Sequence, residues 1–163
     1  MKKIFYLFVT FICLSSFQQT FAQNAGLIPV PFDPSQYGFA ADGGFQGYTN
    51  NNPSGATFGF GFSTFGSYTY NLTQNGGPWN DEIRSASFAG NVNGRVFQIY
   101  DNSGGSTGDD WVTITFKKNP PAGYSYMIYS LEQSYSDEYV DMVYHDHGNL
   151  DGKVSRIVSY RYI

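Results

Sequence analysis

The sequence predicts an all-β protein, an antiparallel Greek-key β-sandwich. Aromatic residues make up 19% of the 163 residues, including 14 Tyr and 15 Phe, and aromatic side chains favour strands. The chain also contains 19 Gly, which suit tight turns, while residues with strong helix propensity are scarce. From residue 79 onward, short strand-like segments are separated by Gly, Asn and Asp, as expected for antiparallel connections.

The first 22 residues are predicted to be a secretory signal peptide. Lys2 and Lys3 form a basic start, residues 4–14 are apolar, and cleavage is expected near Ala22. The apolar run is short for a membrane span, and polar residues end it. We therefore expect a secreted or periplasmic protein without a membrane span. A lipoprotein attached through Cys13 is the alternative, although the residues before Cys13 are not the small ones that lipid attachment favours.

Two segments are expected after the signal peptide. Residues 23–56 are rich in Gly, Pro and Asn, and they predict an irregular arm with one short strand near residues 44–48. Residues 57–163 are predicted to form the β-sandwich domain. Within it, TFGFGFSTFGSYTYNL (57–72) alternates aromatic with small or polar residues, which indicates half-buried strands. Further strand-like segments are IRSASF (83–88), RVFQIY (95–100), WVTITFKK (111–118), YSYMIYSL (124–131), YVDMVYH (139–145) and KVSRIVSYRY (153–162).

Charge and cysteine content limit the function classes. Without Lys2 and Lys3, seven basic side chains remain against 13 acidic ones. This balance disfavours nucleic acid and anionic membranes as partners, and it suits either cation binding or solubility. Cys13 is the single cysteine and would be removed with the signal peptide. The stability of an exported chain must then come from packing or bound ions rather than from disulfides.

A polar cluster recurs at two places in the chain. WNDEIRSASF (79–88) can be laid over LDGKVSRIVSY (150–160). In both copies an apolar residue precedes an Asn or Asp, two or three polar positions, an Ile or Val, and then Arg and Ser in either order before a strand. The alignment pairs Asn80 with Asp151, Asp81 with Gly152, Glu82 with Lys153, Ile83 with Val154 and Arg84 with Ser155.

This repeat resembles the calcium signature of the βγ-crystallin family, in which two Asn or Asp residues, two variable positions, Ser or Thr, and a final Ser precede a strand. VFQIYDNSGG (96–105) is similar to the family's folded hairpin, with Phe97 seven positions before Gly104. Asn102 stands where the family usually has a second aromatic. The likeness covers residues 79–160. The two copies lie 71 residues apart, more than one Greek key usually needs, which implies an insertion or a divergent topology.

The resemblance implies calcium as a cofactor, held between paired loops that both contribute ligands. Calcium takes six to eight oxygen ligands from carboxylates, amides, carbonyls, hydroxyls and water. The implied ligands are Asn80, Asp81 and the Glu82 carbonyl from the first loop, and Asp151, the Lys153 carbonyl and Ser155 from the second.

Two positions depart from the signature. Arg84 places a permanent cation where the family has a ligating hydroxyl, and Gly152 removes an acidic or amide group. At most one calcium site is therefore expected. If neither site binds, the loops are structural turns in which Arg84 pairs with Asp81, Glu82 or Asp151.

Other candidate sites have less support. His145 and His147 could form a zinc pair, but no third ligand is evident, and no GxSxG-type elbow supplies a nucleophile. DNSGGSTGDD (101–110) is rich in oxygen atoms but lacks EF-hand spacing, which favours a solvated hairpin loop.

We expect no enzymatic activity. The expected function is that of a secreted structural or binding module stabilised by calcium. The first alternative is a carbohydrate- or cell-surface-binding module, and a small secreted hydrolase or toxin-inhibitor type protein is the second. The tyrosine-rich face of the first alternative would consist of Tyr124, Tyr126, Tyr129 and Tyr135.

Overall fold

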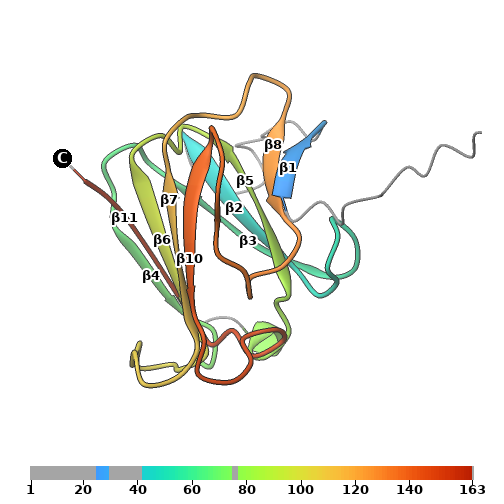
Figure 1. Cartoon of the computed structure of the whole chain (residues 1–163), viewed down its shortest axis with the longest axis vertical. Helices are drawn as coiled ribbons and strands as arrows, with labels where there is room; N and C mark the ends of the chain where they lie inside the picture. Colours follow the sequence, from blue (N-terminus) through green and yellow to red (C-terminus); the bar gives the residue numbers. More distant parts are fainter. Residues whose placement is uncertain (1–24, 30–41, 75–76, 163) are drawn as a thin grey trace, which may run out of the picture.

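The computed structural model describes residues 25–29, 42–74 and 77–162, which form two antiparallel β-sheets (Figure 1). The predicted all-β, antiparallel sandwich class is confirmed. Among the described residues, the helical content is one short 3-10 turn, η2 (Gly77–Trp79), and no helix is long and apolar enough to span a membrane. The predicted signal peptide, residues 1–22, lies outside the described residues.

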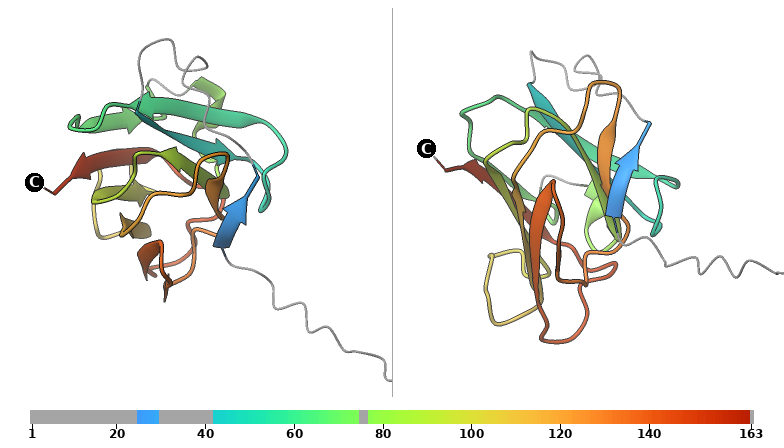
Figure 2. Two further views of the ribbon diagram at one scale, coloured as in Figure 1. Left: turned by 90° about the horizontal axis from the view of Figure 1, so that it is seen from above. Right: turned by 45° about the horizontal axis from the view of Figure 1, so that its top comes forward.

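Sheet A has the strand order β1-β8-β5-β2-β3, and sheet B has the order β4-β11-β6-β7-β10-β9 (Figure 2). The strands of sheet A are β1 (Ala25–Ile28), β2 (Gly43–Tyr48), β3 (Thr57–Phe62), β5 (Ser85–Gly90) and β8 (Ser125–Ile128). The strands of sheet B are β4 (Tyr68–Asn71), β6 (Arg95–Tyr100), β7 (Trp111–Phe116), β9 (Tyr135–Ser136), β10 (Val140–His145) and β11 (Arg156–Arg161).

The sequence predicts that the sandwich starts at residue 57, but its first strands lie before that residue. β2 pairs along its full length with both β3 and β5, and β1 pairs with β8. The strand expected near residues 44–48 is therefore an interior strand rather than part of an arm. The glycines of β2 interrupt the alternation of apolar and polar residues from which strands are predicted. They also allow neighbouring side chains to pack closely against the strand. A Cβ added at Gly47 would lie 2.9 Å from the Ile83 side chain. Residues 30–41 of the predicted arm lie outside the described residues.

Aromatic rings from both sheets fill the centre of the sandwich. The fully buried ring of Phe97 lies 4.8 Å from the ring of Phe88 and 5.6 Å from that of Phe62, between centroids. Phe45 and Phe116 complete the cluster around Phe97. Most of these rings meet at steep angles, which their quadrupoles favour. Strand alternation directs these side chains inward, as the period-two pattern predicts.

The chain is built from two similarly arranged units. In the first, β5 lies beside β2 and β2 beside β3; in the second, β11 lies beside β6 and β6 beside β7. Each unit also gives one strand to the opposite sheet, because β4 pairs with β11 and β8 pairs with β5. FQGY (45–48) and FQIY (97–100) occupy equivalent places, with Tyr48 opposite Ser85 and Tyr100 opposite Arg156. The strands of the two units therefore correspond to one another in their pairing and register.

An insertion in the second unit accounts for the long spacing between the two sequence copies. The first unit passes from β4 through η2 to β5, whereas the second passes from β8 through β9 and β10 before it reaches β11 (Figure 1). β10 pairs with β7 and extends sheet B on that side. The order β11-β6-β7-β10 is that of a Greek key, but the chain visits β8 in sheet A between β7 and β10. The Greek-key assignment therefore stays a prediction.

A buried arginine ties the sheets together at one end. The fully buried Arg95 donates to the carbonyl oxygens of Ser63, Thr64 and Gly66 at 2.7–3.1 Å, and to the Ser159 hydroxyl at 2.9 Å. Its guanidinium also lies 4.3 Å from the centroid of the Phe62 ring. Burial lowers the pKa of Arg95, yet the carbonyl acceptors satisfy most of its donors. Arg95 therefore links the β3–β4 loop to β6 and β11.

Phe97→Ala should lower the free energy of unfolding by about 3–5 kcal/mol, because it removes the ring at the centre of the cluster. Chemical denaturation measures this loss. Val143→Ala is the control, since Val143 is 48% exposed, and it should cost less than about 1 kcal/mol. A loss below about 1 kcal/mol for Phe97→Ala would show that the core is centred elsewhere.

Candidate metal centre

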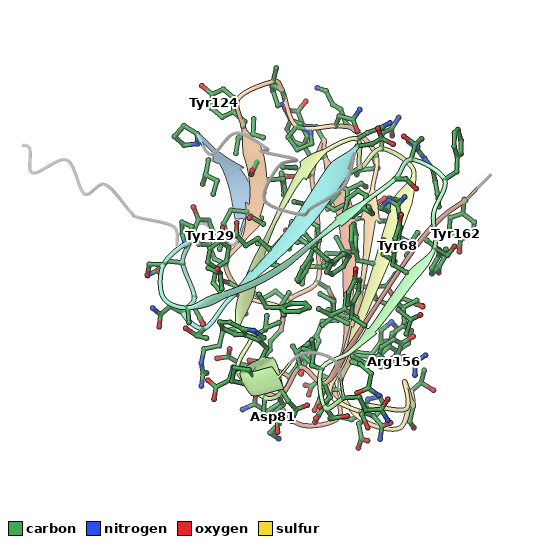
Figure 3. All side chains as sticks on the ribbon, turned by 180° about the vertical axis from the view of Figure 1, so that it is seen from behind. Tyr68, Asp81, Tyr124, Tyr129, Arg156 and Tyr162 are labelled. Carbon is green, nitrogen blue, oxygen red and sulfur yellow. The ribbon has the colours of Figure 1, made fainter. Side chains whose placement is uncertain are left out.

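Two loops meet at one end of the sandwich, and they contain the residues that the sequence singled out. The first loop (79–84) leads from η2 to β5, and the second (150–155) leads into β11. Asp81 N donates to Val154 O at 3.2 Å, and Gly152 N donates to Ile83 O at 3.3 Å. Because Asp81 is equivalent to Gly152, and Ile83 to Val154, the two hydrogen bonds are reciprocal. Figure 3 shows Asp81 at this end of the molecule, beside η2.

Each loop is also fixed to its own unit. Arg84 N donates to Tyr48 O at 2.9 Å, and Ser155 N donates to Tyr100 O at 2.8 Å, again at equivalent positions. Asp81 and Gly152 have φ values of 61° and 72°, the left-handed region that Gly adopts freely and Asp tolerates better than most residues. The two backbones therefore match, and their side chains decide what each half of the site can hold.

We define the first half-site as Asn80, Asp81, Lys153 and Ser155, where oxygen atoms gather. The Ser155 hydroxyl lies within hydrogen-bond distance of two acceptors, Asp81 Oδ1 at 3.3 Å and the Lys153 carbonyl oxygen at 3.4 Å. Adjacent oxygens bound to one calcium at about 2.4 Å lie roughly 3–3.5 Å apart, so these spacings fit a shared cation.

Asn80 gives further support for a cation at the first half-site. Its Nδ2 donates to Asp81 Oδ2 at 2.7 Å, which fixes the amide next to the carboxylate. Its Oδ1 is buried and has no hydrogen-bond partner among the described residues. A buried acceptor without a partner is costly, and a ligand bound to this oxygen would offset that cost.

We define the second half-site as Glu82, Arg84, Asp151 and Gly152, and it contains its own cation. Arg84 occupies the position equivalent to Ser155, and its Nη1 lies 2.9 Å from Asp151 Oδ2. Gly152 occupies the position equivalent to Asp81, and a Cβ there would lie 2.8 Å from Arg84 Nη2. The guanidinium thus packs against the Gly152 backbone, and this half-site does not fit a metal ion.

The six predicted ligands are divided between the two half-sites. Asn80, Asp81, Lys153 and Ser155 come together, while Asp151 pairs with Arg84, one of the pairings expected if the loops bind no ion. Glu82 is exposed, and its amide donates to Trp79 O at 3.4 Å. Within the described ranges, no three His, Cys, Asp or Glu side chains gather as a metal-binding group. The candidate ligands here are instead a carboxylate, an amide, a hydroxyl and a carbonyl.

The surroundings of the first half-site are acidic. Burial raises the pKa of Asp101, the Lys153 ammonium opposes this shift, and the Asp109, Asp110 and Asp81 carboxylates add to it. Asp101 lies at the start of the β6–β7 loop, where its amide donates to Asp110 O at 3.0 Å. A cation nearby would relieve the repulsion between these carboxylates.

Asp110 and Glu132 position the second loop, and the sequence analysis did not identify this role. Asp110, only 3% exposed, accepts hydrogen bonds from His147 N at 2.7 Å, Asn149 N at 2.6 Å and the Tyr144 hydroxyl at 3.0 Å. Glu132 Oε1 accepts one from Asp151 N at 2.6 Å. These contacts join segments distant in the chain, so no local pattern indicates them.

The two histidines considered as a zinc pair make other contacts in the structure. The His145 ring stacks on Trp111 with centroids 3.8 Å apart and nearly parallel planes. His147 is exposed and contributes its backbone amide to Asp110. Aromatic stacking and loop closure therefore account for both residues.

The four tyrosines proposed for a glycan platform do not share an exposed face. Tyr126 is fully buried, and its hydroxyl donates to Asp137 Oδ2 at 2.6 Å. Tyr124 is 43% exposed and lies on the loop before β8, well separated from Tyr129 in Figure 3. Strand alternation places Tyr126 in the core, which divides the set.

Comparisons with known proteins identify no relative: no family model, no curated protein and no solved structure matches this chain. Its function therefore has to be argued from the fold and from the two loops.

Asp110→Asn should destabilise the protein by about 1–3 kcal/mol at neutral pH, because three donors lose a charged acceptor. Burial alone would raise the pKa of Asp110, but the bonds from His147, Asn149 and Tyr144 outweigh it and hold that pKa below its ordinary value. The ionised form is thus favoured in the folded state. Its stabilising effect is complete above the ordinary Asp pKa of about 3.9 and is lost as the pH falls through the lower folded value.

The difference in unfolding free energy between wild type and Asp110→Asn should therefore shrink below about pH 4, as measured by denaturation at a series of pH values. A difference that stays constant into the acid range would contradict this role for the Asp110 carboxylate.

Proposed function

We propose that this chain is a secreted, non-enzymatic β-sandwich module of βγ-crystallin type, stabilised by one calcium ion at the first half-site. The observation that carries the proposal is the meeting of the Asp81 carboxylate, the Ser155 hydroxyl and the Lys153 carbonyl across the two loops. Asp81 belongs to one unit, while Lys153 and Ser155 belong to the other. A shared ion would therefore fasten the two units together.

The internal architecture supports the proposed βγ-crystallin type. The two units exchange one strand each between the sheets, and their signature loops have matching hydrogen bonds and matching left-handed turns. The resemblance implies paired motifs that share calcium, and this arrangement brings the motifs side by side. The part of the proposal that concerns secretion rests on the predicted signal peptide, residues 1–22.

The ligands on this chain suit a weak site of an extracellular kind. Asp81 supplies one negative charge, Asn80 and Ser155 supply neutral side-chain oxygens, and Lys153 supplies a backbone carbonyl. Calcium sites with few charged ligands in extracellular modules have dissociation constants of about 10⁻⁴–10⁻³ M, and water completes their coordination. An ion that binds the folded state alone stabilises it by about 2.7 kcal/mol at one hundred times its dissociation constant.

Calcium should raise the melting temperature of the wild-type protein, and a chelator should reverse the increase. Asp81→Asn should raise the calcium concentration needed for the same increase in melting temperature at least about tenfold. The substitution removes the carboxylate, while Asn still tolerates the left-handed turn. Differential scanning calorimetry measures both effects.

Glu138→Gln is the matched control for Asp81→Asn, since its side chain is 67% exposed and lies in the β9–β10 turn. It should keep the wild-type calcium response. A melting temperature that does not depend on calcium in the wild type would exclude the proposed stabilisation.

Arg84→Ser combined with Gly152→Asp should create a second calcium site. The pair restores a hydroxyl and a carboxylate at the positions equivalent to Ser155 and Asp81, and Asp suits the left-handed backbone of residue 152. Removal of Arg84 also frees the space that a Cβ at residue 152 needs. Isothermal titration calorimetry should give two calcium ions per chain for the double variant and one for the wild type. An unchanged stoichiometry would show that the two half-sites are not chemically equivalent.

A further inference from the structure

One end of the sandwich holds aromatic rings out into solvent. Phe65, in the turn between β3 and β4, is 84% exposed, Tyr162 after β11 is 71% exposed, and Tyr124 before β8 is 43% exposed. All three lie at the end where β3 and β11 finish and β8 begins, opposite to η2 and the signature loops (Figure 1). Val143, within β10, is the other large hydrophobic side chain that is exposed in the described part of the chain.

The turn that carries Phe65 (residues 63–67) is fixed by a buried charge. Arg95 donates to the carbonyl oxygens of three of its residues, and Arg161 Nη1 donates to Thr64 O at 3.2 Å. None of the side chains in this turn is buried, so these bonds do not bring a side chain into the core. Burying a guanidinium is costly, and its effect here is to hold the turn in one conformation with the Phe65 ring in solvent.

The amides of the turn are also paired inside the protein. Ser63 N donates to the Tyr68 hydroxyl at 2.8 Å, and Thr64 N donates to Asp42 Oδ2 at 2.7 Å. Gly66 N donates to Ser63 O at 3.3 Å. Ser63, Thr64 and Gly66 therefore have partners for both backbone groups. Contact with an apolar medium would leave none of these groups unpaired, and this is the condition that lipid sets for a backbone.

Charge is divided unevenly between the two ends. Among the described residues, eight acidic and three basic side chains lie at the η2 end, in residues 79–84, 101–110, 132 and 146–156. The other described charged residues number four of each sign, and the ion pairs Lys117–Asp141 and Lys118–Glu138 neutralise half of them. The end with the exposed aromatic rings is thus close to neutral. It complements a zwitterionic surface, whereas the acidic end would be repelled by an anionic one.

We propose that this end docks on a zwitterionic lipid bilayer, with Phe65 inserted among the acyl chains and Tyr162 at the level of the headgroups. Tyr suits that level because its ring is apolar while its hydroxyl stays in water. The hydrogen bond from Arg161 to Thr64 joins the two neighbours of these rings, so both rings meet the same part of the surface. A pocket on a protein would take one protruding ring, whereas exposed rings on separate loops suit a flat surface.

Cosedimentation with phosphatidylcholine vesicles tests the proposal. The wild type should bind, and Phe65→Ser should lower the partition coefficient at least about tenfold, because it removes the inserted ring. The variant should keep the wild-type melting temperature, since backbone groups make the hydrogen bonds of the turn. Val143→Ser is the matched control: it removes an exposed apolar side chain from β10 and should bind as the wild type does.

Lipids brominated on their acyl chains give a second measurement, because bromine quenches the fluorescence of a tryptophan that it contacts. Trp79 and Trp111 lie towards the η2 end, so these lipids should leave the wild-type emission unchanged. Phe65→Trp should add an emission that they quench. A wild type that does not bind the vesicles, or that Phe65→Ser leaves bound, would overturn the proposal. Binding that requires anionic lipid, or quenching of the two native tryptophans, would overturn it as well.

Discussion

The two reciprocal hydrogen bonds between the signature loops, from Asp81 to Val154 and from Gly152 to Ile83, are the constraint on which the candidate site depends. They join loops that are 71 residues apart in the sequence and belong to different units. Because backbone groups make these bonds, the loops meet whatever side chains they carry. The exchange of β4 and β8 between the sheets brings the loops close enough for this pairing. The chemistry of the site is then set by a few side chains on a fixed frame.

Those side chains differ between the half-sites, and the difference decides where a metal ion fits. In the first half-site the Ser155 hydroxyl lies 3.3 Å from Asp81 Oδ1, so oxygen atoms of the two loops lie together where the proposed calcium would bind. In the second, Arg84 faces Gly152 and pairs with Asp151, so a cation is already part of the chain. The Arg84 side chain is 44% exposed, and such surface pairs contribute only about 0–1 kcal/mol. A bound calcium can contribute more, because its effect rises with concentration.

The sequence was informative where local rules apply. Alternation and turn residues predicted most strands from β3 onward, and the repeated polar cluster predicted that residues 80–82 and 151–155 belong to related loops. It was less informative where contacts are distant. The interior place of β2 depends on close packing against Ile83 rather than on alternation. The role of Asp110 depends on a loop that follows it by more than thirty residues, and strand alternation placed Tyr126 in the core rather than on a binding face.

The most direct test of the asymmetric site is an anomalous difference map from crystals grown with calcium. We expect one peak per chain, about 2.3–2.6 Å from the Asp81 carboxylate, the Ser155 hydroxyl and the Lys153 carbonyl. No peak is expected beside Arg84 and Asp151, where the guanidinium takes the place of the ion. A map without a peak at the first half-site, or with one at the second, would contradict this expectation.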